Sequence, residues 1–104
     1  MKLILDLETN GFLDRENLVI HCIVCKDIET NEVYSYNPNT INDALELLNK
    51  AEVLIGHNIT GFDIRALKQV LNYEFKGKAF DTLLCSRLIW TNRLELDYQY
   101  KQMP

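Results

Sequence analysis

The sequence predicts an α/β fold built on one mixed β-sheet, in a chain of 104 residues that suits a single small domain. Three apolar, strand-like runs come first. A helical pattern, a fourth strand-like run and a second helical pattern follow them. The expected order is therefore βββαβα, with a loop and a further helix after it. Hydrophobic residues make up 47% of the chain, which is enough apolar material for one core.

The first three strands are expected to form an antiparallel meander. The first begins at Leu3, and residues 18–25 form an apolar run suited to a central strand. Residues 33–36 alternate as a shorter third strand, after a polar stretch with its turn at Thr30-Asn31. Asn37-Pro38-Asn39 then ends the meander.

The next stretch is expected to be helix, strand and loop. Thr40 is placed to cap a helix, with Asp43 three residues later, and apolar residues recur at helical spacing through Leu48. Residues 53–55 are short, apolar and β-branched at both ends, which favours a buried strand parallel to the first. Residues 56–61 are expected to be a loop.

Two more helices are predicted after this loop. Ile64, Leu67 and Leu71 recur at helical spacing and indicate the second helix. Asp81-Thr82 is expected to cap a third helix, which stops near Asn92. The polar tail after it shows no clear period, and we expect that a longer chain was cut there.

Asp6 and Glu8 stand two residues apart at the end of the first strand. Because side chains on a strand alternate between its two faces, both carboxylates are expected to leave the same face. Two anions side by side repel one another unless a cation or a proton lies between them, which favours a metal site. Taken alone, the pair is more typical of two surface acids at a solvated strand end.

A second polar stretch follows the fourth strand. Gly56 and Gly61 allow a tight turn or the close approach of a ligand, and Asn58 offers a donor and an acceptor. Asp63 falls at a helix start, where free backbone N–H groups favour an ionised carboxylate. In a parallel arrangement this stretch lies at the carboxyl end of the fourth strand, where open α/β sheets usually place their sites.

The two acidic stretches are therefore expected to meet at one edge of the sheet. Asp63 alone is more typical of a helix cap, and His57 alone of a loop or packing residue. Together with Asp6 and Glu8 the combination is far more specific.

At these residues the chain resembles the DEDD family of 3′–5′ exonucleases. Asp6-Leu7-Glu8-Thr9 looks like the first motif, and residues 57–63 look like the second, an Asn followed by an aromatic-Asp pair. Within that family the resemblance is to the proofreading domain of podophage-type family A DNA polymerases. It extends to Phe80-Asp81-Thr82-Leu83 and Ser86-Arg87-Leu88-Ile89, and covers roughly the first 92 residues.

The resemblance implies an RNase H-like fold, a two-metal active site and a single-stranded DNA 3′ end as substrate. By position, Asp6 would bridge both metals, Glu8 would bind the more tightly held one and Asp63 would act on the second. The residues implied to contact the terminal nucleotide or shape its pocket are Thr9, Asn10, Phe12, Asn58 and Phe62. For both phenylalanines, core packing is an equally good interpretation.

The tail departs from the family pattern. The family has a third motif, a Tyr or His four or five residues before a fourth Asp, which supplies a metal ligand and orients the attacking water. Neither Tyr98 nor Tyr100 has such an Asp after it. We therefore expect residues 1–104 to be one exonuclease-like domain that lacks the C-terminal part of the fold, as a fragment, a split gene product or a degraded remnant.

The predicted function is that of a proofreading 3′–5′ exonuclease domain of a DNA polymerase, an enzyme impaired in this chain as given. Mg²⁺ or Mn²⁺ is the expected cofactor, because hard divalent ions prefer carboxylate oxygens. The expected partners are a single-stranded DNA 3′ end and a downstream polymerase domain, in the same or a separate chain. A non-catalytic nucleic-acid- or partner-binding remnant of the same fold and a DEDD exoribonuclease remain open alternatives.

Composition excludes several other classes. No run reaches the ~18 consecutive apolar residues of a membrane helix, and the N-terminus turns acidic too soon for a signal peptide. The expected location is the cytoplasm, that of a bacterial host if a phage encodes the chain. The net charge of −4 argues against a general polyanion binder, and 11 of the 15 Asp and Glu residues lie within residues 1–63.

Three cysteines, an odd number, are typical of free thiols in a reducing compartment. Cys22 and Cys25 have CxxC spacing but lie in a strand-like run, so they are expected on opposite faces and not as a zinc or redox site. Cys85 lies in a helical pattern and is expected to be a small core residue.

Overall fold

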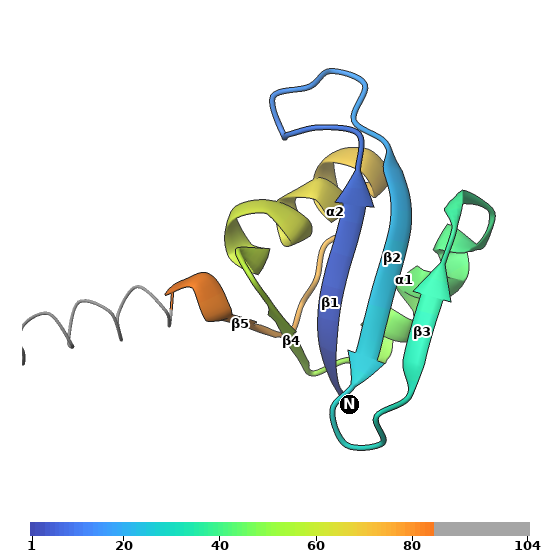
Figure 1. Ribbon diagram of the computed structural model, residues 1–104, viewed down its shortest axis with the longest axis vertical. Helices are drawn as coiled ribbons and strands as arrows, with labels where there is room; N and C mark the ends of the chain where they lie inside the picture. The colour runs from blue at the N-terminus through green and yellow to red at the C-terminus, as the bar shows by residue number, and fades with distance from the viewer. Residues whose placement is uncertain (85–104) are drawn as a thin grey trace, which may run out of the picture.

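The structure is a computed structural model that describes residues 1–84, which form a five-stranded mixed sheet with two α-helices on one face (Figure 1). The strands lie in the order β3-β2-β1-β4-β5. In chain order the elements are β1 (Lys2–Thr9), β2 (Ile20–Asp27), β3 (Val33–Tyr36), the 3₁₀ turn η1 (Pro38–Thr40), α1 (Ile41–Lys50), β4 (Val53–Gly56), the π-helical turn η2 (Ile59–Asp63), α2 (Ile64–Leu71) and β5 (Lys78–Asp81).

The predicted meander is confirmed, but its second strand is shifted by two residues, from 18–25 to 20–27. β1 pairs with β2, and β2 with β3, both antiparallel. The second strand begins at Ile20, whereas the sequence predicted that it begins at Leu18. The register shifts between Glu8 and Thr9, whose partners are Cys22 and Ile20, so the pairing is irregular there. The apolar run could not reveal the later start of β2, because Leu18 is buried although it precedes the strand.

The core lies between the sheet and the two helices. Along β1, Leu3, Leu5 and Leu7 are buried and the residues between them are exposed, so Asp6 and Glu8 do share the open face, as predicted. β4 is parallel to β1, which was also predicted. The other buried apolar residues of this core are Leu18, Ile20, Ile23, Cys25, Ala44, Leu47, Leu48, Ala51, Leu54, Ile59, Ala66 and Leu67.

The cap predicted for the first helix is wrong. Thr40 stands before α1 but makes no side-chain bond to it. Its hydroxyl instead accepts a hydrogen bond from the backbone N–H of Asn37 at 2.9 Å, and the Asn37 side chain accepts one from Asn39. These two bonds form a capping box for η1, which competes successfully for the Thr40 hydroxyl.

The fifth strand was not predicted from the sequence. Residues 78–81 pair with β4 in parallel, where a loop and the start of a helix were expected. Lys78, Ala79 and Phe80 are all exposed, so no burial period marks them as a strand. Thr82 to Leu84 are helical, in agreement with the predicted third helix. The rest of that helix, with Cys85, and the polar tail lie outside the described residues.

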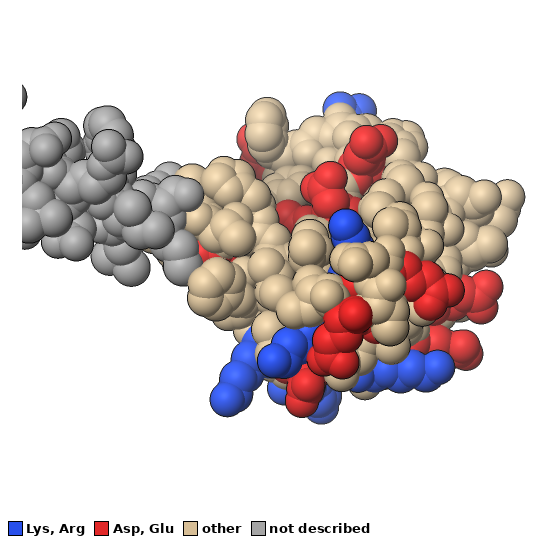
Figure 2. Space-filling model, turned by 60° about the horizontal axis from the view of Figure 1, so that its bottom comes forward, with Lys and Arg blue, Asp and Glu red and all other residues tan. Residues whose placement is uncertain are grey.

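None of the helices within residues 1–84 is long and apolar enough to cross a membrane. On the face shown in Figure 2, acidic and basic side chains are interspersed and do not gather into one patch of either sign.

The two described cysteines should differ sharply in reactivity. Both are free; Cys25 is fully buried in the core, and Cys22 lies on the open face of the sheet, opposite Glu8. Burial raises the pKa of the Cys25 thiol to about 12, so little thiolate is available there. In native protein without reductant, we expect Cys22 to be alkylated at least about tenfold faster than Cys25, as read by peptide mass spectrometry.

Complete unfolding should remove this difference, which is the internal control. A Cys22–Cys25 disulfide in the native protein, or equal rates at the two thiols, would contradict the strand assignment.

Candidate functional site

A pocket of about 370 Å³ opens where β1 and β4 end, at the carboxyl edge of these two parallel strands. The turn η2 packs against β1 and supplies one wall. The lining residues are Asp6, Leu7, Thr9, Gly11, Phe12, His57, Asn58, Phe62 and Asp63. The two acidic stretches of the sequence therefore contribute to one pocket, at the edge where they were expected to meet.

Six of the eight residues singled out from the sequence line this pocket, and Glu8 and Asn10 do not. Glu8 is exposed on the open face of β1. The side-chain amide of Asn10 is used within the loop that follows β1. Its Oδ1 accepts a hydrogen bond from the Val19 N–H at 2.8 Å, and its Nδ2 donates to the Asn17 carbonyl at 3.1 Å. These two bonds hold the loop against the residues that precede β2.

The segment after β4 is more helical than predicted. A loop was expected over residues 56–61, but Gly56 ends β4 and residues 59–63 form η2, which runs directly into α2. Asn58 begins this helical segment in the left-handed region, with φ of 57°. The π-helical turn was not predicted, since its hydrogen bonds span one residue more than those of an α-helix and it does not follow the apolar spacing of an α-helix.

Asp63 is not at a free helix start, and this corrects the expectation that its ionised form would be favoured. Its backbone is helical, and it is the last residue of the turn η2, directly before α2. The side chain is only 6% exposed. Burial and, to a smaller extent, the charge of Asp6 raise the pKa of the Asp63 carboxyl to about 6, although hydrogen bonds with the backbone of Leu7 and of Asp63 itself lower it in part.

Asp6 and Asp63 thus form a pair of carboxylates that repel each other at one pocket wall. Such a pair is relieved by a proton or by a cation between the two groups. Oxygen ligands of this type suit Mg²⁺ or Mn²⁺. Within residues 1–84, no group of three or more His, Cys, Asp or Glu side chains is placed to hold a metal ion, and Glu8 lies outside this pocket.

The two phenylalanines have different environments. Phe12 is 79% exposed, so core packing does not account for it. Phe62 is half-buried, packs against the core and also lines the pocket. Both rings border a further hollow of about 380 Å³, beside Asn58 and Gly61. An exposed aromatic ring at the mouth of an acidic pocket is suited to stacking on a planar ligand.

Asp81 was expected to cap a helix, and in the structure it also accepts hydrogen bonds from the segment that follows β4. Its carboxylate accepts a hydrogen bond from the Leu83 N–H at 2.9 Å, which is the predicted cap. It also accepts bonds from the Asn58 N–H at 2.9 Å, the Thr60 N–H at 3.1 Å and the Thr60 hydroxyl at 2.7 Å. Burial raises the pKa of Asp81, but these hydrogen bonds outweigh it and hold the pKa at about 2.

His57 is exposed, lines the pocket, and has its Nδ1 3.1 Å from the Thr82 hydroxyl. A packing role in the core does not apply to it. The contacts of His57 and Asp81 were not predicted, because both depend on β5, the strand that the sequence pattern did not reveal.

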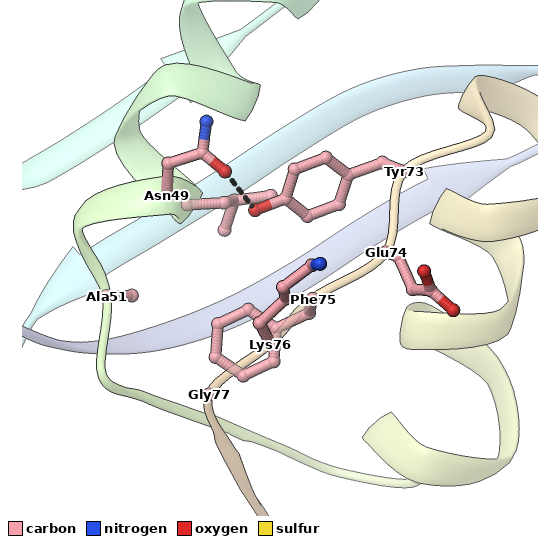
Figure 3. Close-up of a pocket in the computed structure, with 8 residues that line it drawn as sticks. Asn49, Ala51, Tyr73, Glu74, Phe75, Lys76 and Gly77 are labelled. Atoms are coloured by element: carbon pink, nitrogen blue, oxygen red, sulfur yellow. Dashed lines mark hydrogen bonds between the residues drawn. The ribbon is translucent and has the colours of Figure 1, made fainter.

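A separate pocket of about 200 Å³ lies between the end of α1 and the segment that leads into β5 (Figure 3). Tyr73 donates a hydrogen bond to Asn49 across it at 2.8 Å, and Phe75 and Lys76 form the opposite wall. None of the residues predicted to be functional lines this pocket.

Comparison with known proteins gives a family and a fold. A family model described as the RNase_H superfamily matches residues 3–102. The comparison with curated protein sequences found no match. Among solved structures, the chain is similar to the family B DNA polymerase from the hyperthermophilic archaeon Pyrobaculum calidifontis, with 17% identity and a TM-score of 0.57 over 68% of this chain. The chain covers 11% of the length of that polymerase, and at this identity the likeness shows the fold alone.

Proposed function

The chain belongs to the RNase_H superfamily, and we propose that it is the nuclease portion of a 3′–5′ exonuclease that acts on the 3′ end of single-stranded DNA. The observation that carries the proposal is the pocket at the end of β1, where Asp6 and Asp63 share a wall with Asn58, Phe12 and Phe62. It joins acidic, amide and aromatic side chains within one hollow.

The acidic wall supports a metal-dependent reaction. Asp6 and Asp63 would hold divalent cations, with Glu8 brought in from the adjoining open face of β1. Bound there, Mg²⁺ or Mn²⁺ would supply Lewis-acid activation of water and stabilise the leaving oxygen. The chain's own contribution is to keep Asp63 in a nearly dry position, where its carboxylate binds a cation more strongly than in water.

The remaining pocket residues support binding of a strand end. Phe12 is free to stack on an unpaired base, an interaction that does not depend on base identity. The side-chain amide of Asn58 can donate to a phosphate or sugar oxygen and accept from a hydroxyl. Thr9 keeps its hydroxyl bonded to the Gly11 carbonyl at 2.8 Å, so its role in the pocket is to shape the turn under Phe12.

We propose further that the chain works together with a DNA polymerase domain. The DEDD pattern and the resemblance to podophage-type family A polymerases favour a proofreading role beside a polymerase domain, in the cytoplasm of a bacterial host. The similarity to a DNA polymerase of another family supports this context at the level of fold.

The activity test uses single-stranded DNA labelled at its 5′ end and incubated with Mg²⁺. We expect 3′–5′ shortening that is slow for the 104-residue chain and at least about a hundredfold faster for a longer chain carrying a third motif, since positioning and charge stabilisation supply most of the catalysis in such sites. Asp6→Ala in the longer chain should abolish it. Shortening by the 104-residue chain at the rate of the longer one would contradict the role given to the third motif.

One observation favours a second candidate, a non-catalytic nucleic-acid-binding domain of the same fold. Within residues 1–84, Glu8 lies outside the pocket and no third acidic side chain joins Asp6 and Asp63. In that case the longer chain should bind single-stranded DNA without shortening it. An RNA substrate is tested in the same assay by exchanging the labelled strand for its RNA counterpart.

A further inference from the structure

The loop that carries Asn58 into the pocket is held from outside, by the neighbouring strand β5. In the parallel pair of β4 and β5, Gly56 is the partner of Asp81, so the last residues of the two strands lie side by side. A Cβ at Gly56 would lie 3.0 Å from the Leu5 carbonyl oxygen, so the end of β4 also lies close against β1. The chain leaves β4 at this point, within reach of the Asp81 carboxylate.

The Asp81 carboxylate accepts hydrogen bonds at the beginning of the helical segment of residues 59–71. The first N–H groups of a helix have no partner inside it. Asn58 occupies the N-cap position, but its side chain makes no capping bond. The Asp81 carboxylate accepts from the backbone N–H groups of Asn58 and Thr60 instead, and from the Thr60 hydroxyl. The helix is therefore capped by a side chain from another strand.

The bond to Asn58 also holds a backbone conformation that is unfavourable by itself. Asn58 has φ of 57° and ψ of 32°, in the left-handed region that residues with a Cβ adopt at a cost in free energy. Its side chain lies directly against Gly61, where an added Cβ would overlap the Asn58 Oδ1. Without its external bond, Asn58 would be free to return to a common conformation and leave the pocket wall.

A second link lies one residue further along. The Thr82 hydroxyl is 3.1 Å from His57 Nδ1, so the last residue of β5 and the residue after it contact two successive residues of the pocket, Asn58 and His57. Asp81 and Thr82 themselves do not line the pocket.

We propose that Asp81 is a positioning residue of the candidate site, which sets the place of Asn58 and, through Thr60, of the helical turn that carries Asp63. It touches neither substrate nor metal in this role, because its buried carboxylate already accepts four hydrogen bonds. The inference rests on the proposed function, since the site that Asp81 positions is the proposed one.

Asp27 provides a matched control. It is also a buried carboxylate, 6% exposed like Asp81, and it also accepts bonds from backbone N–H groups, those of Glu29 at 2.9 Å and Thr30 at 3.4 Å. It holds the turn between β2 and β3, at the other end of β1 from the pocket. Asp27→Asn therefore reproduces the loss of a buried capping carboxylate without touching the candidate site.

The experiment measures Mn²⁺ affinity of the full chain by paramagnetic broadening, together with the amide resonances of the loop. Asp81→Asn places an NH₂ group against donors that need an acceptor, and we expect it to weaken Mn²⁺ binding about tenfold or more. Thr60→Val removes the hydroxyl bond only, and should cost about threefold; Thr60→Ser should restore the affinity to within about twofold. Asp27→Asn should lower the melting temperature but leave the affinity within about twofold.

Two results would overturn the inference. Equal losses of Mn²⁺ affinity in Asp81→Asn and Asp27→Asn would mean that the effect is one of global stability. Unchanged affinity in Asp81→Asn, with the Asn58 and Thr60 amide resonances displaced, would mean that the loop position does not matter to the site.

The design separates this inference from the proposed function. If the wild type binds no Mn²⁺, the proposed function fails. The positioning role is then still decided by the Asn58 and Thr60 amides, which Asp81→Asn must displace and Asp27→Asn must not.

Discussion

Replacing Asp63 with asparagine is expected to raise the free energy of unfolding at pH 7.5 by about 2 kcal/mol in metal-free buffer, while removing metal-dependent activity. The gain arises because Asp63 is buried beside Asp6, and these two conditions raise its pKa from 3.8 to about 6. Full ionisation of such a group costs at most about 3 kcal/mol by linkage. An asparagine keeps the shape but carries no charge.

The sign of the pH dependence follows from the raised pKa. Below pH 3.8 Asp63 is protonated in the folded and the unfolded chain. Between pH 4 and 6 the folded chain holds the proton more tightly, so the wild type loses stability as the pH rises through about 6. The difference between Asp63→Asn and wild type should therefore grow from near zero at pH 4 to its full value above pH 7.

Urea unfolding at several pH values measures this difference. The pH dependence of stability that both proteins share, such as the part due to Asp81, cancels in the comparison. Asp14→Asn, which removes an exposed acid, is the control and should change stability by less than about 0.5 kcal/mol. A constant difference across the pH range, or a less stable Asp63→Asn at pH 7.5, would show that Asp63 is not a buried, strained carboxylate.

The second large effect is expected at Gly77, which precedes β5. A Cβ there would overlap the Phe75 ring and would lie 2.6 Å from the Glu52 carbonyl oxygen. That carbonyl accepts the hydrogen bond from the Lys78 N–H at 2.9 Å, which begins the pairing of β4 with β5. Since backbone cannot move aside as a flexible side chain can, Gly77→Ala should destabilise the fold by about 2–3 kcal/mol.

Gly11→Ala is the matched control for this change. A Cβ at Gly11 would meet only the Arg15 side chain, with Cδ at 2.9 Å, and that long side chain can rotate away. Denaturant unfolding should show a loss below about 0.5 kcal/mol for Gly11→Ala. Equal losses in the two variants would mean that the close approach of Gly77 to Glu52 does not hold β5 in place.

Apolar runs and their spacing made most of the fold predictable. Leu3, Ile4 and Leu5 form an apolar run that indicated the first strand, and the alternation of side chains along a strand gave the shared face of Asp6 and Glu8. The α/β fold and the RNase H-like sheet that the resemblance implied are confirmed by the strand order and the family match. β5 was not predictable in the same way, because a strand held by backbone pairing alone leaves no apolar period.

The candidate site was predictable in composition but not in electrostatics. Residue spacing brought the two acidic stretches to one edge of the sheet. It could not show that η2 turns Asp63 inward against β1, which reverses the expected direction of its pKa shift. Nor could it show that the amide of Asn10 is used by Val19 and Asn17, since those bonds depend on how the loop folds back.

If Asp6 and Asp63 form a binding site for divalent cations, thermal unfolding of the full chain over a series of Mn²⁺ concentrations should reveal it. An ion that binds only the folded chain stabilises it by about 2.7 kcal/mol at a hundred times its Kd. We expect a melting temperature that rises with Mn²⁺ in the wild type and is unchanged by Mn²⁺ in Asp6→Ala. No rise in the wild type, or an equal rise in Asp6→Ala, would contradict it.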